Sequence, residues 1–312
     1  MFARSPDAPR TLLAVMALAL LPATSPAQVL PWEVTVAEVD TGRLRNLSER
    51  LSKQNLLYQL HLGDTRKSDL VETTAKIDRI LESLEQGSPS YGIPAPWTPE
   101  LREQVLRVDA AWGPLRTIAV ASPYDYLRVT RQFMPAENRL GDPLLIRYFD
   151  NLNLDFIAES EKLLDLYDAE CRKTGLEVCA TAKASGYNAM LIERATKQAV
   201  FVVAGIEAKR NREGLKATVA AYEKQRAANS ASPFFAAALA PDRGASARGA
   251  TELLESLRKD WDEMRAEFKT LEAGDEKNFD LHRLLLVQSR LVGKVERFTA
   301  ALVRYANVTY GS

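Results

Sequence analysis

Apolar residues recur along most of the chain at spacings of three and four, and charged residues fill the positions between them. This period is typical of amphipathic α-helices, and the alternation at period two that marks a half-buried strand is nearly absent. The pattern predicts an all-α protein. The clearest seam, interrupted only by Gln288, runs through Leu281, Leu284, Leu291, Val295, Phe298, Leu302 and Tyr305.

Segments rich in Pro, Gly or Ser separate the predicted helices, and the longest of these connections are 87–96, 121–142 and 229–246. Amphipathic helices bury one stripe each against their neighbours, and short connections favour antiparallel packing in a bundle. We therefore expect eight helices. They lie near 33–62, 66–87, 98–121, 142–173, 178–209, 212–228, 246–271 and 276–309.

The two halves of the chain carry related sequences. Residues 42–54 align without gaps with residues 186–198, and six of the thirteen positions are identical. The identical pairs are Gly42 and Gly186, Leu47 and Leu191, Glu49 and Glu193, Arg50 and Arg194, Lys53 and Lys197, and Gln54 and Gln198. Downstream, Trp112 falls on Trp261 in nearly the same register, and both are expected in the core. The chain is thus predicted to hold two tandem antiparallel four-helix bundles, over 28–175 and 176–312.

The first 27 residues have the features of a secretory signal peptide. Arg4 and Arg10 precede a short apolar run, and Ser25-Pro26-Ala27 offers small residues for cleavage. The apolar run is about eleven residues, well below the ~20 that span a bilayer. Cleavage would remove two of the 41 basic and one of the 41 acidic residues, which leaves a formal charge of −1. We expect a periplasmic protein.

Several classes of function are excluded by the residues present. A near-neutral exported chain lacks the charge of a nucleic-acid binder. The two histidines, His61 and His282, have no companion at metal-ligand spacing, so no metal site is predicted. The chain has no nucleophile elbow and no phosphate-binding glycine loop, so neither an enzyme nor a cofactor is expected.

The segment from Gly42 to Leu51, GRLRNLSERL, resembles the signature of the N-terminal sensor domain of type IV pilus chemotaxis transducers, the PilJ-type domain. It is similar also to the periplasmic box of nitrate/nitrite-sensing histidine kinases. The resemblance implies a four-helix bundle that binds a small oxyanion, such as nitrate, between the first helices of a dimer. Gly42, Arg45 and Arg50 are the implied ligand residues. The second copy departs from the signature, because Ala189 stands at the position of Arg45.

Helical geometry alone leaves the role of Arg45 open. At 100° per residue, Arg45 and Glu49 lie on one flank of the buried stripe, whereas Arg43 and Arg50 lie on the other. Arg45 can offer several N–H donors to a planar anion in a seam between helices. Glu49, four residues on, can instead pair with Arg45 and neutralise the site.

Cys171 and Cys179 are the only cysteines, and they are expected to pair in an oxidising compartment. Within one continuous helix their Cα atoms would be about 12 Å apart, beyond the ~7 Å limit for a disulfide. A bond therefore requires a helix break, which Lys173-Thr174-Gly175 can supply. The alternative is a pair of free thiols on one long helix.

Two hypotheses of function follow. In the first, the protein is a periplasmic sensor that binds a small anion and passes the signal to a membrane or pilus-related partner. In the second, it is a structural or adaptor scaffold in an envelope or type IV pilus-related assembly, and its ligand site has decayed. Ala189 and Glu49 favour the second.

Overall fold

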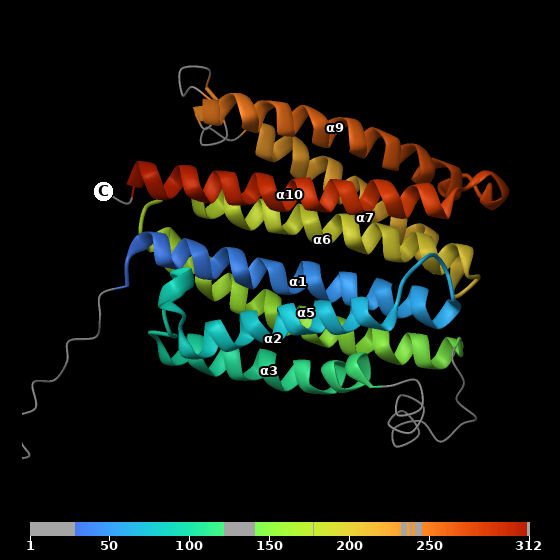
Figure 1. Ribbon diagram of the computed structural model, residues 1–312, viewed down its shortest axis with the longest axis horizontal. Coiled ribbons are helices and arrows are strands. Elements are labelled where there is room, and N and C mark those ends of the chain that lie inside the picture. The colour runs from blue at the N-terminus through green and yellow to red at the C-terminus, as the bar shows by residue number, and fades with distance from the viewer. Residues whose placement is uncertain are drawn as a thin grey trace, which may run out of the picture.

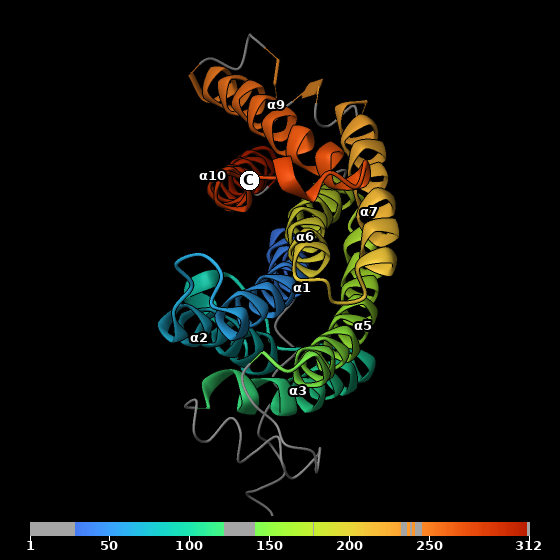
Figure 2. The ribbon, with the colours of Figure 1, turned by 90° about the vertical axis from the view of Figure 1, so that its right-hand side faces the viewer.

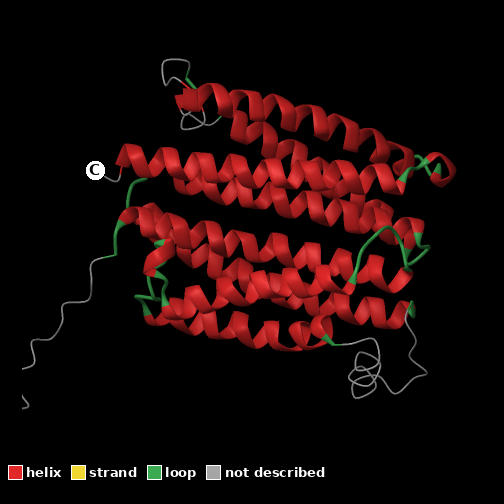
Figure 3. Ribbon diagram, in the orientation of Figure 1, coloured by secondary structure: helices red, strands yellow, loops and turns green. Residues whose placement is uncertain are grey.

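The computed structural model describes residues 29–121, 141–176, 178–231, 236–237, 239–240 and 245–310, so the predicted signal peptide lies outside it. Within these ranges the chain is helical, with no strand and one isolated bridge between Ser88 and Ile93 (Figure 3). The predicted all-α class is confirmed. In the same ranges, no helix combines the length and apolarity needed to cross a membrane.

In the part of the chain that the structure describes, eight long helices occupy nearly the predicted ranges. They are α1 (Pro31–Leu60), α2 (Lys67–Gln86), α3 (Pro99–Val120), α5 (Pro143–Lys173), α6 (Val178–Val203), α7 (Ala208–Ser230), α9 (Ala245–Glu272) and α10 (Leu281–Tyr310). Two short 3-10 helices accompany them, η1 (Pro89–Tyr91) and η3 (Glu276–Asn278).

Three predicted boundaries were wrong, and one of them is the start of α7, which lies at Ala208 and not at 212. Helix α6 stops at Val203 instead of continuing to 209, because the chain turns through Gly205 and Glu207, both at positive φ. The stretch predicted to begin the last helix at 276 forms η3, and α10 starts at Leu281. Elsewhere the ends follow local chemistry, as where Asp142 accepts a hydrogen bond from the Leu144 amide at 2.8 Å just before α5.

The described side chains form two main apolar cores. One is built from α1, α2, α3 and α5, and the other from α6, α7, α9 and α10. Figure 2 looks along the helices and shows the two groups of four on either side of the α1–α6 contact. Trp112 and Trp261 are buried in the first and second core respectively, as expected.

Helix α1 of the first group and helix α6 of the second lie side by side where the two groups meet. Both run in the same direction (Figure 1). Gly42 faces Gly186 at the contact, where a Cβ atom on Gly186 would lie 3.6 Å from the Gly42 Cα. The absence of both side chains allows the two backbones to approach closely. The aligned pair Gly42 and Gly186 therefore lies directly at the contact between the two helices.

Replacing Trp112 with Ala should lower the free energy of unfolding by about 3–5 kcal/mol, because it removes a large buried side chain and leaves a cavity. Trp112 also donates a hydrogen bond to Asp78 at 2.8 Å and packs 5.2 Å from the ring of Phe156. Leu106→Ala on the same helix is the control, since Leu106 is 52% exposed and should change stability by no more than about 0.5 kcal/mol. Equal losses in urea unfolding would contradict this placement of the core.

Candidate functional site

The contact between α1 and α6 contains two reciprocal ion pairs. Arg50 Nε lies 2.9 Å from Oε1 of Glu193, and Arg194 Nε lies 2.6 Å from Oε1 of Glu49. Each pair joins an arginine of one helix to a glutamate of the other. Since Arg50 aligns with Arg194 and Glu49 with Glu193, the contact has approximate two-fold symmetry.

Two lysines extend this symmetry one turn further. Lys53 Nζ is 2.6 Å from Glu193, and Lys197 Nζ is 2.7 Å from Glu49. The two environments then differ, because Lys53 also donates to the neutral Gln288, whereas Lys197 pairs with Asp150 at 2.6 Å. The cluster of Glu49, Arg50, Lys53, Glu193, Arg194 and Lys197 is called the exchange cluster below.

Because their partners differ, the pKa values of Lys53 and Lys197 shift in opposite directions. Burial lowers the pKa of Lys53, and attraction by Glu193 does not restore it. Burial acts on Lys197 too, yet the carboxylates of Asp150 and Glu49 outweigh it and raise the Lys197 pKa. Burial alone would raise the pKa of Glu193, but Lys53 and Arg50 lower it overall, so the carboxylate stays charged.

Arg45 lies beside this cluster and is paired far less well. It is 4% exposed, and its Nε and Nη2 atoms have no hydrogen-bond partner among the described residues. Its contacts are the exposed carboxylate of Glu161, 3.7 Å from Nη1, and the ring of Tyr187, 5.6 Å from Cζ. Burial lowers the pKa of Arg45. The guanidinium is therefore a buried cation with unused donors.

The structure separates the three predicted ligand residues. Arg45 faces α5 and α6, where Glu161 and Tyr187 lie, whereas Arg50 lies on the side of α10 and pairs with Glu296 at 2.9 Å. Gly42 lies between them at the contact with Gly186. Glu49 pairs with Arg194 and Lys197 and not with Arg45. The Arg45–Glu49 ion pair, which the sequence left open as an alternative to anion binding, is therefore not formed.

The structure bears also on the expected dimer through the first helices. Helix α1 is packed against α2, α5, α6 and α10 of its own chain. The side of α1 that carries Gly42 and Glu49 contacts α6. The homodimer through the first helices stays a prediction.

Sequence reasoning did not select Glu49, Glu193, Arg194 or the two lysines as functional residues. The sequence nevertheless contained a feature that could have pointed to them, because these residues are among the identical pairs that relate the two halves. A buried ion pair between copies requires both partners in each copy, so the two halves keep the same residues. Tyr187 and Glu161 carried no such signal, since neither belongs to an identical pair.

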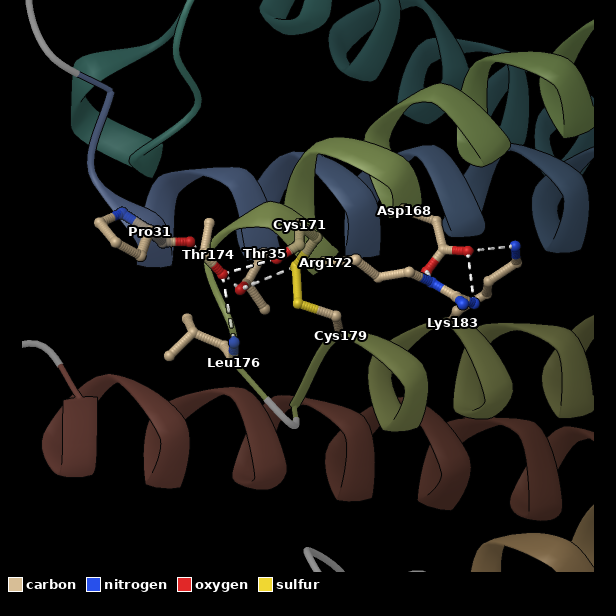
Figure 4. Close-up of a disulfide and its surroundings, with 9 residues drawn as sticks. All are labelled: Pro31, Thr35, Asp168, Cys171, Arg172, Thr174, Leu176, Cys179 and Lys183. Carbon is tan, nitrogen blue, oxygen red and sulfur yellow. Dashed lines mark hydrogen bonds and ion pairs between the residues drawn. A yellow bond between two sulfur atoms is a disulfide. The ribbon is translucent and has the colours of Figure 1, made fainter.

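Cys171 and Cys179 form a disulfide with Cα atoms 5.9 Å apart (Figure 4). Helix α5 ends at Lys173, and Gly175 at a φ of +73° turns the chain toward α6. On the neighbouring turn of α5, Asp168 accepts hydrogen bonds from Arg172 and Lys183 (Figure 4). The disulfide links the end of α5 to the start of α6, where the chain passes from the first group of helices to the second.

Comparison with known families gives one match. Residues 39–131 match the PilJ family, described as the type IV pili methyl-accepting chemotaxis transducer N-terminal domain. The match contains the α1 segment that carries Gly42, Arg45 and Arg50, and it confirms the resemblance predicted from that segment. No curated protein and no solved structure matches the chain.

The PilJ match indicates a sensor domain of the chemotaxis-transducer type, and PilJ domains are typically extracellular or periplasmic parts of membrane proteins. They are non-catalytic, which agrees with the prediction that the protein is not an enzyme. The match does not extend to α6. The status of the second half as a second PilJ copy therefore remains a prediction, drawn from the aligned residues.

Replacing Glu193 with Ala should lower the free energy of unfolding by about 3–5 kcal/mol, because Lys53 would be buried without its carboxylate. The double variant Lys53→Met/Glu193→Leu should lose less, since no charge is left unpaired. Glu103→Ala serves as the control, because it breaks the exposed pair with Arg107, worth at most about 1 kcal/mol. Chemical unfolding measures all three, and a double variant less stable than Glu193→Ala would contradict the argument.

Proposed function

We propose that the protein is an exported, non-catalytic sensor that binds a small planar oxyanion of the nitrate type at Arg45 and signals to a protein partner. One observation carries the proposal: Arg45 is buried, and two of its guanidinium nitrogens have no partner among the described residues. The predicted signal peptide supports a periplasmic location.

The energetics of Arg45 favour an anion. A buried cation whose donors are unpaired lowers stability, and a partner that accepts its hydrogen bonds offsets that loss. Glu161 offsets little, because its carboxylate is 46% exposed and 3.7 Å away. A planar oxyanion matches the fork of the Nε and Nη2 donors.

Arg194 supplies a second cation to the same place. Arg45 and Glu49 are one helical turn apart on the same face of α1, and Glu49 binds Arg194. Glu161 and Tyr187 interact electrostatically with both arginines. Among the described residues, the hydrogen-bond partner of Arg194 Nη2 is the Met190 sulfur, at 3.7 Å. Arg194 would thus provide the positive charge that Ala189 does not.

The parallel α1–α6 contact would then replace a dimer of separate chains. An anion held between Arg45 and Arg194 bridges the two helices and competes with Glu49 for Arg194. Binding would therefore alter the exchange cluster and the packing of one group of helices on the other. A membrane or pilus-related partner could recognise that change. In the alternative, a scaffold with a decayed site, no anion would affect the fold.

Sodium nitrate or nitrite should raise the melting temperature of the mature protein relative to sodium chloride at equal ionic strength. An anion at a hundred times its Kd adds about 2.7 kcal/mol to the free energy of unfolding. Arg45→Ala should abolish this response, whereas Arg43→Ala, an exposed cation two residues away, should retain it. Absence of any nitrate or nitrite response in the wild-type protein would favour the scaffold hypothesis.

Arg194→Gln should weaken anion binding about tenfold or more, the effect of losing one charge-assisted hydrogen bond. Arg50→Gln is a matched control, because Arg50 makes the equivalent ion pair with Glu193 but lies on the side away from Arg45. Titration calorimetry of both variants with nitrate distinguishes them. Equal affinities would show that Arg194 does not contact the anion.

A further inference from the structure

A second buried group of polar atoms lies where α5 passes into α6, at the same end of the molecule as the start of α1. Glu38 of α1 is fully buried, and neither of its carboxylate oxygens has a hydrogen-bond partner among the described residues. A carboxylate oxygen of Glu38 and the sulfur atoms of Cys171 and Cys179 all lie within 4.8 Å of one another. Both cysteines are buried as well.

From this juxtaposition we infer that reduction of the Cys171–Cys179 disulfide creates a site for a thiolate-binding divalent cation such as Zn²⁺, held by the two sulfurs and Glu38. Two thiolates and a carboxylate are a ligand set that suits zinc, with bonds of about 2.0–2.3 Å. The sulfurs come from α5 and α6 and the carboxylate from α1. A bound cation would therefore join three helices, where the disulfide joins two.

The unpartnered carboxyl of Glu38 is the observation that points to a ligand. A carboxyl group that is buried without hydrogen bonds destabilises the fold, and such groups are uncommon in folded proteins. Burial raises the pKa of Glu38 to about 8, with a further contribution from Asp168, so the group is neutral at pH 7. The oxidised protein therefore holds an uncharged donor group beside the sulfur atoms.

The chemistry balances when a two-electron reductant is supplied. A dithiol breaks the S–S bond by exchange and is itself oxidised to a disulfide, whereas a phosphine does so with water and becomes the phosphine oxide; in both cases the cysteines end as two thiols. The cation then displaces about three protons, one from each thiol and one from Glu38. Oxidation of the thiols would release the cation, so occupancy depends on the redox state.

Charged side chains lie next to the site. A divalent cation with two thiolates and one carboxylate carries a net charge of −1. The charged groups that act on Glu38 are Asp168, Lys183 and Arg172. Lys183 and Arg172 both bind Asp168, and Lys183 also binds Asp165, so two cations and two carboxylates lie next to the site. The threonine Thr35, whose hydroxyl lies 3.6 Å from the Cys171 sulfur, adds an oxygen nearby.

The test is a titration of the mature protein with Cd²⁺, a spectroscopic substitute for Zn²⁺, after reduction with a phosphine that does not bind the metal. The reduced protein should show a sulfur-to-cadmium charge-transfer band that saturates at one ion per chain, and the oxidised protein should show none. Competition with a chromogenic chelator gives the Zn²⁺ affinity. Glu38→Gln should weaken Zn²⁺ binding tenfold or more, and Cys179→Ser should abolish the band.

Asp40→Asn is the matched control, because Asp40 is another buried carboxylate of α1 that already pairs with Arg43. Its affinity for Zn²⁺ should equal that of the wild type. Circular dichroism before and after adding metal tests whether the reduced chain is folded. A reduced wild-type protein without a 1:1 band, a Glu38→Gln protein of unchanged affinity, or a loss of helix that Zn²⁺ does not reverse would each overturn the inference.

Discussion

The parallel packing of α1 on α6 is the constraint on which the rest of the structure depends. Two glycines bring the backbones together, and the exchange cluster then buries two glutamates, each against an arginine and a lysine of the opposite helix. A buried carboxylate that lost its partners would be strongly destabilising, so relative rotation or sliding of the two helices is opposed. Because each helix also contributes to its own core, this contact fixes how the two groups of four helices are placed.

The same symmetry explains why the candidate site exists only once. Where the first half of the chain has the buried Arg45, the second half has Ala189, so the two sides of the contact differ in their charged side chains. On the side of α5, Arg45 and Arg194 interact electrostatically with each other, and the carboxylates around them include those of Glu49, Glu161 and Asp165. On the side of α10, Arg50 is shared between Glu193 and Glu296. An approximate two-fold contact thus produces an asymmetric distribution of charge.

The group formed by Glu38 and the Cys171–Cys179 disulfide, near the start of α1, is separate from the ion pairs at the α1–α6 contact. Glu38 precedes Arg45 by about two helical turns and faces the chain between α5 and α6. The disulfide there closes a short loop, and its position relative to α1 follows from the packing of α1 and α5. The proposed anion site and the proposed metal site therefore share one helix and can be tested separately.

The sequence by itself determined the all-α class and most helix boundaries, because amphipathic periodicity, prolines and capping residues act over a few residues. It also indicated the segment that matches PilJ, since that signature is continuous along α1. It failed at Gly205, because a single glycine within a helical pattern does not by itself end a helix, and at 276–280, where a 3-10 helix precedes α10. Only the tertiary structure decided that Glu49 pairs with Arg194 and leaves Arg45 unpaired, that Arg45 and Arg50 face opposite sides, and that Glu38 meets the disulfide. Each of these depends on which helix packs against which, and helical periodicity fixes the buried face of a helix without naming its neighbour.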